Sequence, residues 1–146
     1  MTARGASNPK REWVGTVRNW MTRTPRGVAP DTPVSQVAGL MRSEGIRHVL
    51  VMEGEQLVGV VSERDVRGLR MTQDQMASPH SAVTAVMSDF PITVDPETLL
   101  TDAVRIMLEH KIGAVIALDS GRPVGILTRS DALEALLTAV ESIARQ

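Results

Sequence analysis

The chain contains the same stretch of sequence twice, and this repeat limits the folds that are open to it. Residues 58–65 read VGVVSERD and residues 124–131 read VGILTRSD, which places the copies 66 positions apart. The register holds without an insertion over about 50 residues. Other identical pairs at this offset are Met21 with Met87, Pro25 with Pro91, Val28 with Val94, Pro30 with Pro96, Thr32 with Thr98 and Met41 with Met107. Because one such repeat has an apolar face that it cannot bury alone, we expect the two to pack as a pseudo-twofold pair.

Each copy has the pattern of an extended piece, a helix, two strands and a second helix, in the order β-α-β-β-α. We therefore predict an α/β fold. In the first copy the expected elements are an extended piece at 27–29, a helix capped by Thr32 and ended by Gly45, strands at 46–52 and 57–62 joined by a turn at 53–56, and a helix at 63–69.

The repeat also divides the chain. We assign 1–16 to an N-terminal tail and short helix, 17–69 to the first repeat, 70–82 to a linker, and 83–146 to the second repeat with a C-terminal helix. Because Trp13, Val14, Val17 and Trp20 have helical spacing, we expect a short helix whose tryptophans dock on the domain or on a partner chain.

Composition excludes several classes of function. A formal charge of −1 and only three aromatic residues make nucleic-acid binding unlikely. The chain has no cysteine, no long apolar stretch and no signal-like apolar segment, so we expect a cytoplasmic protein without disulfides or membrane spans. The three histidines lack metal-ligand spacing, and no nucleophile–base set is present. We therefore predict no catalytic residues, no metal and no required cofactor.

The repeated stretch places polar residues where a strand runs into a helix. Thr128, Arg129 and Asp131 occupy this position in the second copy, and Ser62 and Asp65 in the first. Backbone N–H groups and the positive end of the helix dipole suit phosphate there, and a carboxylate can accept from two ribose hydroxyls. From the residues alone, the alternative that Thr128 is only a helix cap and Asp131 only a first-turn acid stays open.

The order and spacing of these motifs resemble the CBS domain. Each repeat opens with Val-x-x-x-Met, continues with Val-x-Pro-Glu-Thr or a close variant, and ends with Gly, two apolar residues, Thr or Ser, two variable residues and Asp. The resemblance covers about residues 17–133, and two such repeats in tandem are similar to a Bateman module. It implies a regulatory module that binds adenine nucleotides (AMP, ADP or ATP) or S-adenosylmethionine, forms a homodimer and modulates a separate, unidentified protein.

The resemblance also implies binding residues, copy by copy. Asp131 and Asp65 would hold ribose hydroxyls, Thr128 and Ser62 would contact ribose or phosphate, and Arg129 would face phosphate. The residues implied at the base are Thr93, Ile112 and Ala114 in the second copy and Gly27, Ile46 and His48 in the first.

The two copies differ at the phosphate-facing position, where Arg129 corresponds to Glu63. Because a carboxylate opposes a phosphate, we expect the second copy to bind nucleotide more tightly than the first. The alternative function is a dimerisation or protein-interaction module that needs no ligand. Its support is the apolar surface of the C-terminal helix, which carries Leu136, Leu137 and Val140.

Overall fold

The computed structural model describes residues 14–23, 25–71, 78 and 80–145. These residues form two compact units, each with one four-stranded sheet. The first-repeat unit spans 25–91, and the second-repeat unit combines residues 92–146 with residues up to position 24. The mixed α/β class with two sheets confirms the predicted fold class, while the pseudo-twofold packing of the repeats stays a prediction.

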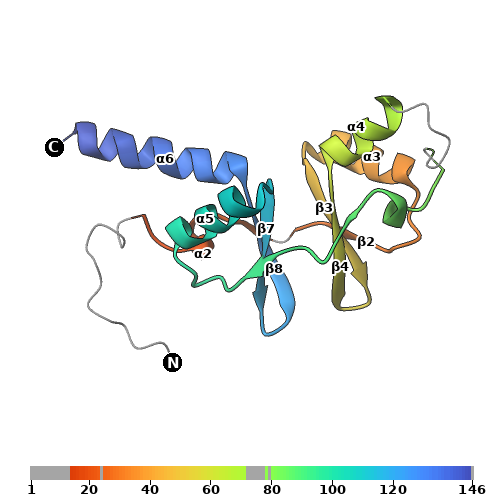
Figure 1. Cartoon of the computed structure of the whole chain (residues 1–146), viewed down its shortest axis with the longest axis horizontal. Helices are drawn as coiled ribbons and strands as arrows, with labels where there is room; N and C mark the ends of the chain where they lie inside the picture. Colours follow the sequence, from red (N-terminus) through yellow and green to blue (C-terminus); the bar gives the residue numbers. More distant parts are fainter. Residues whose placement is uncertain (1–13, 24, 72–77, 79, 146) are drawn as a thin grey trace. The chain divides into compact units, whose positions relative to one another are not determined.

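The first-repeat unit has strand order β2-β3-β4-β5. Its elements are β2 (Gly27–Val28), α3 (Val34–Glu44), β3 (His48–Glu53), β4 (Gln56–Ser62), α4 (Glu63–Met71), η1 (Val83–Ala85) and β5 (Ser88–Asp89). Figure 1 shows α3 and α4 on the same side of the β3–β4 hairpin. Their apolar residues form one core with the sheet, and its buried members include Val37, Met41, Val49, Val61 and Val83.

The second-repeat unit has strand order β1-β8-β7-β6. Its elements are α2 (Val17–Trp20), β1 (Thr22–Arg23), β6 (Thr93–Val94), α5 (Leu100–His110), β7 (Ala114–Asp119), β8 (Arg122–Thr128) and α6 (Arg129–Ala144). In Figure 1, α2, α5 and α6 lie on one side of the β7–β8 hairpin. The core beneath them contains Val17, Leu100, Met107, Val115 and Leu127, all buried.

Most predicted elements of the first copy form within two residues of their expected bounds. Gly45 ends α3 in the left-handed conformation, with φ 65°, and the turn of the hairpin lies at Gly54 and Glu55. The predicted helix cap is wrong by one residue, because α3 begins at Val34 with Pro33 as its N-cap. Trp13 and most of the predicted linker lie outside the described residues.

The compact units do not coincide with the linear repeats. β1 precedes the first repeat's helices in the chain but pairs antiparallel with β8 of the second repeat. Reciprocally, β5 opens the second repeat but pairs antiparallel with β4 of the first. Each repeat therefore contributes its opening segment to the sheet of the other repeat.

A methionine fitting against a glycine accompanies each of these exchanged strands. A Cβ built on Gly125 would lie 2.7 Å from Met21 Cγ, and one built on Gly59 would lie 3.0 Å from Met87 Cγ. Both distances are shorter than ordinary van der Waals contact, so only glycine lets the methionine approach the strand this closely. The repeated Met and the repeated Gly of the sequence are thus partners across the exchange.

We expect fragment 25–91 to unfold cooperatively, and fragment 17–79 not to. The two fragments have nearly equal lengths and both contain α3, α4 and the β3–β4 hairpin. Fragment 17–79 lacks β5 and Val83, which is fully buried in the core of this unit. Urea unfolding followed by circular dichroism measures the difference. An equally sharp transition in both fragments would contradict the assignment of 83–91 to the first-repeat unit.

We expect Gly125→Ala and Gly59→Ala to destabilise the full chain by about 1–3 kcal/mol each, because the added methyl group overlaps a methionine side chain. Gly39→Ala in α3 is the matched control, since a Cβ there meets nothing within 4 Å. It should be neutral or stabilising by up to about 1 kcal/mol. Adding Met21→Ala to Gly125→Ala should recover part of the loss. Chemical denaturation checks all four variants, and equal effects for Gly39 and Gly125 would contradict the packing argument.

Candidate functional site

The predicted binding residues of each copy lie at one end of the sheet within a single unit. In the second-repeat unit, Ala114 pairs with Thr128 across the β7–β8 ladder, and Thr93 on β6 pairs with Ile116, two residues further along β7. We call the set Thr93, Ile112, Ala114, Thr128, Arg129 and Asp131 the second half-site. The set Gly27, Ile46, His48, Ser62 and Asp65 is the first half-site, where Gly27 pairs with Leu50 and His48 with Ser62.

A reciprocal pair of hydrogen bonds joins strand to helix in the second half-site. The Thr128 N–H donates to Asp131 Oδ2 at 2.8 Å, and the Asp131 N–H donates to Thr128 Oγ1 at 3.3 Å. The Thr128 hydroxyl also donates to Oδ2, at 3.0 Å. This is a capping box, which satisfies N–H groups that the start of α6 would otherwise leave unpaired.

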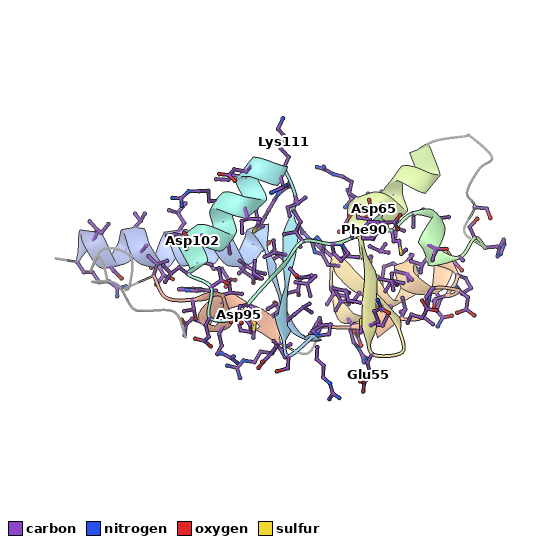
Figure 2. The ribbon with its side chains drawn as sticks, turned by 60° about the horizontal axis from the view of Figure 1, so that its bottom comes forward. Glu55, Asp65, Phe90, Asp95, Asp102 and Lys111 are labelled. Atoms are coloured by element: carbon purple, nitrogen blue, oxygen red, sulfur yellow. The ribbon has the colours of Figure 1, made fainter. Side chains whose placement is uncertain are left out.

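The first half-site contains the same device. The Ser62 N–H donates to Asp65 Oδ2 at 2.8 Å, and the Asp65 N–H donates to Ser62 Oγ at 3.1 Å. Figure 2 labels Asp65 at the start of α4. In both half-sites Oδ2 makes the cap, and the described residues offer no partner to Oδ1. The capping role of Thr128 and Ser62 is therefore confirmed, and the cap uses only one oxygen of each aspartate.

The backbone N–H groups of Ile112 and Ile46, which precede β7 and β3, are already hydrogen-bonded within the protein. The Ile112 N–H donates to the Met107 carbonyl, and the Ile46 N–H donates to the Met41 carbonyl, both at 3.1 Å. These bonds close the ends of α5 and α3, so the two N–H groups are not free to donate to a base. Any recognition by main-chain groups at Ile112 and Ile46 falls to their carbonyl oxygens.

Charge is arranged differently in the two half-sites. Arg129 is exposed, and no described residue forms an ion pair with it. Its guanidinium lies over Gly113, with Cζ 3.6 Å from the position of a Cβ there. The backbone N–H of Arg129 donates to the Gly113 carbonyl at 3.2 Å. The second half-site thus presents a cation that the described residues leave unneutralised.

Glu63 occupies the position of Arg129 in the first half-site, but its charge is compensated. Its Oε1 lies 2.5 Å from Arg67 Nη2, and its Oε2 lies 3.8 Å from Arg47 Nε. The hydrogen bond from Arg67, followed by the charges of Arg67 and Arg47, holds the pKa of Glu63 below its ordinary value. Two arginines of the same unit therefore compensate the carboxylate at this position.

Two residues beside the first half-site, Arg67 and Met52, were not among the binding residues predicted from the sequence. Arg67 was detectable, because Glu and Arg four residues apart on a helix form ion pairs. Met52 was not. A Cβ on Gly27 would lie 3.0 Å from Met52 Cγ, so Met52 takes space beside the strand where the second half-site has the Thr93 side chain. Only the sheet brings residues 27 and 52 together.

A shallow hollow of about 40 Å³ lies elsewhere in the second-repeat unit. It is lined by Val14, Trp20, Ala135, Thr138, Ala139 and Ser142, and it contains none of the predicted binding residues. The Trp20 indole N–H donates to the Val14 carbonyl at 2.7 Å. Trp20 therefore docks on the domain as predicted, against the small residues of α6.

In the part of the chain that the structure describes, no three His, Cys, Asp or Glu side chains gather as a metal site. Nor does any described helix have the length and apolar character needed to cross a membrane.

Comparison with known proteins identifies the family. A sequence model of the CBS domain matches residues 14–71 and again 83–138, and the chain belongs to the CBS-domain family as a tandem pair. Among curated relatives, CBS domain-containing protein YhcV of Bacillus subtilis is 29% identical over 118 residues, which cover 81% of this chain and 83% of YhcV.

Another relative is a much longer protein. Inosine-5'-monophosphate dehydrogenase of Korarchaeum cryptofilum is 33% identical over 109 residues, or 71% of this chain, but the match spans only 21% of that enzyme. The resemblance to it therefore concerns a small part of its length.

Solved structures agree with the family assignment. The structure of CBSX2 in complex with AMP is 30% identical, has a TM-score of 0.73, and is matched over 86% of this chain and 98% of CBSX2. An uncharacterized conserved protein from Pyrococcus horikoshii is 29% identical with a TM-score of 0.74, over 83% and 91% of the two chains.

Proposed function

We propose that this protein is a regulatory module that binds an adenosine-containing ligand and modulates a separate protein. Candidate ligands are AMP, ADP, ATP and S-adenosylmethionine. The proposal rests above all on one observation, which both repeats share where a strand runs into a helix. There the aspartate of the capping box uses one carboxylate oxygen in the cap, and the described residues leave the other unpaired. The AMP complex of CBSX2, a relative of similar length, supports the choice of an adenine nucleotide.

Each half-site offers the groups that such a ligand needs. Asp131 and Asp65 can accept from ribose hydroxyls through Oδ1, and the carbonyls of Ile112 and Ile46 can meet the edge of the base. Phosphate would lie at the start of α6, where N–H groups, the helix dipole and Arg129 all favour an anion. No step of this scheme is catalytic, and we propose a cytoplasmic protein that is not an enzyme.

We propose that the second half-site binds phosphorylated ligand more tightly. Arg129 is available there without breaking an ion pair, whereas Arg47 and Arg67 of the first half-site already engage Glu63. Thr93 adds a side-chain hydroxyl that Gly27 lacks. A charge-assisted contact to phosphate contributes about 1.5–3 kcal/mol, which corresponds to about tenfold or more in affinity.

We expect Asp131→Ala to abolish the tighter AMP binding and Asp65→Ala to leave most of it. The two variants are matched controls, because each removes the same capping box and should cost a similar helix stability, about 1 kcal/mol. Isothermal titration calorimetry with AMP on the full chain measures the affinities. Two equal sites in the wild-type chain, or loss of the tight site in Asp65→Ala alone, would overturn the assignment.

The alternative function, a dimerisation module, is favoured by the exposed face of α6. Leu133, Leu136, Val140 and Ile143 follow the three–four spacing of coiled-coil core positions, and Leu137 adjoins them. Their exposed fractions are 53–63%. Trp20 leaves these residues uncovered, because it packs on the Ala135 and Ala139 side of the helix.

We call the apolar face of α6 formed by these five residues the seam, and we propose that a second copy of this chain covers it. We propose this homodimer in addition to nucleotide binding, not in place of it. The seam is self-complementary, because leucine, valine and isoleucine at these positions pack equally well against themselves. With about 100 Å² exposed on each of the five side chains, two copies would bury about 1,000 Å², which is about the minimum area of a biological interface and fits a weak dimer.

We expect light scattering to give a dimer at tens of micromolar for the wild-type chain and a monomer for Leu136→Glu. Leu108→Glu is the control, because Leu108 is 73% exposed but lies on α5, outside the seam. It introduces the same side chain and should leave the dimer intact. A wild-type monomer at this concentration, or equal effects of the two substitutions, would count against the proposed interface.

A further inference from the structure

Two pairs of equivalent positions distinguish the half-sites. Arg47 and Glu63 of the first correspond to Gly113 and Arg129 of the second. In both half-sites the backbone N–H of the first helical residue donates to a backbone carbonyl. Glu63 donates to Arg47 at 2.8 Å, and Arg129 donates to Gly113 at 3.2 Å. The backbones therefore match, and the difference lies in the side chains.

The side chains of the first half-site form a satisfied ion triad. Each carboxylate oxygen of Glu63 faces a different guanidinium, Oε1 toward Arg67 and Oε2 toward Arg47. Arg67 corresponds to Leu133 of the second repeat, so the triad has no counterpart there. The Glu63 carboxylate pairs with Arg47 and Arg67 in the way that an anion bound at the start of α4 would pair with them.

We propose that Glu63 is a built-in anion that restricts the first half-site to adenosine ligands without a 5′-phosphate, while the second half-site accepts phosphorylated ones. The proposal rests on the proposed function and specifies the ligand class of each half-site. A phosphate at the start of α4 would compete with Glu63 for Arg47 and Arg67 and would be repelled by the displaced carboxylate. A neutral nucleoside meets no such competition, because its ribose needs only Asp65.

The test is a titration of the full chain with two probes, AMP and adenosine. We expect the wild-type chain to bind AMP at one site and Glu63→Gln to bind it at two, with at least about a tenfold gain at the first half-site. Adenosine affinity should change less than twofold. Glu63 is not part of the Ser62–Asp65 cap, so the substitution leaves that cap in place. A purely structural role for Glu63 would move both probes together.

Two further variants sharpen the outcome. Asp102→Asn removes a carboxylate from another exposed ion pair, with Arg105 at 3.4 Å, and should not create an AMP site. Arg67→Gln added to Glu63→Gln should remove most of the gained AMP affinity, because it takes away one of the released cations. Failure of this double variant to reduce the gain would overturn the role given to Arg67.

The outcomes separate this inference from the function beneath it. One AMP site in the wild-type chain and no second site in Glu63→Gln would overturn the inference and leave the proposed function standing. So would two AMP sites in the wild-type chain. No binding of AMP, adenosine or S-adenosylmethionine to any variant would overturn the proposed function, and this inference with it.

Discussion

The close approach of a methionine to a strand glycine is the contact on which the rest of this structure depends. Met21 reaches Gly125, and Met87 reaches Gly59. Each contact holds a two-residue strand against the sheet of the other repeat, so neither sheet is built from one continuous repeat. Because a side chain on either glycine would exclude the methionine, this packing explains why Met and Gly recur together in both copies.

Stability and the proposed binding depend on the same two carboxylate groups at the half-sites, Asp131 and Asp65. The capping boxes of Thr128 with Asp131 and Ser62 with Asp65 turn each strand into its helix and orient the carboxylate. One oxygen then serves the fold and the other is left for a ligand. The geometry of Asp131 and Asp65 therefore permits both a capping role and a ligand-binding role, because a carboxylate has two acceptor oxygens.

The charges of the half-sites were only partly predictable. Comparing Glu63 with Arg129 located the difference between the copies, and the side chains of both residues lie at the expected helix starts. The structure pairs Glu63 with Arg67 and Arg47, which weakens its expected repulsion of phosphate, because a compensated carboxylate repels an anion less than a lone one. Residue identity at one position does not determine the local field, since Arg67 of α4 and, more weakly, Arg47 before β3 also contribute.

The sequence alone determined the repeat, the order of its elements and the strand-to-helix corners with their polar residues. These features depend on local periodicity and on contacts between residues three or four apart, which a single sequence displays. The tertiary structure decided which sheet each opening strand joins, that Met52 occupies the space beside Gly27, and that Trp20 lies on the alanine side of α6. Such contacts join residues far apart in the chain, and only the folded backbone brings them within reach of each other.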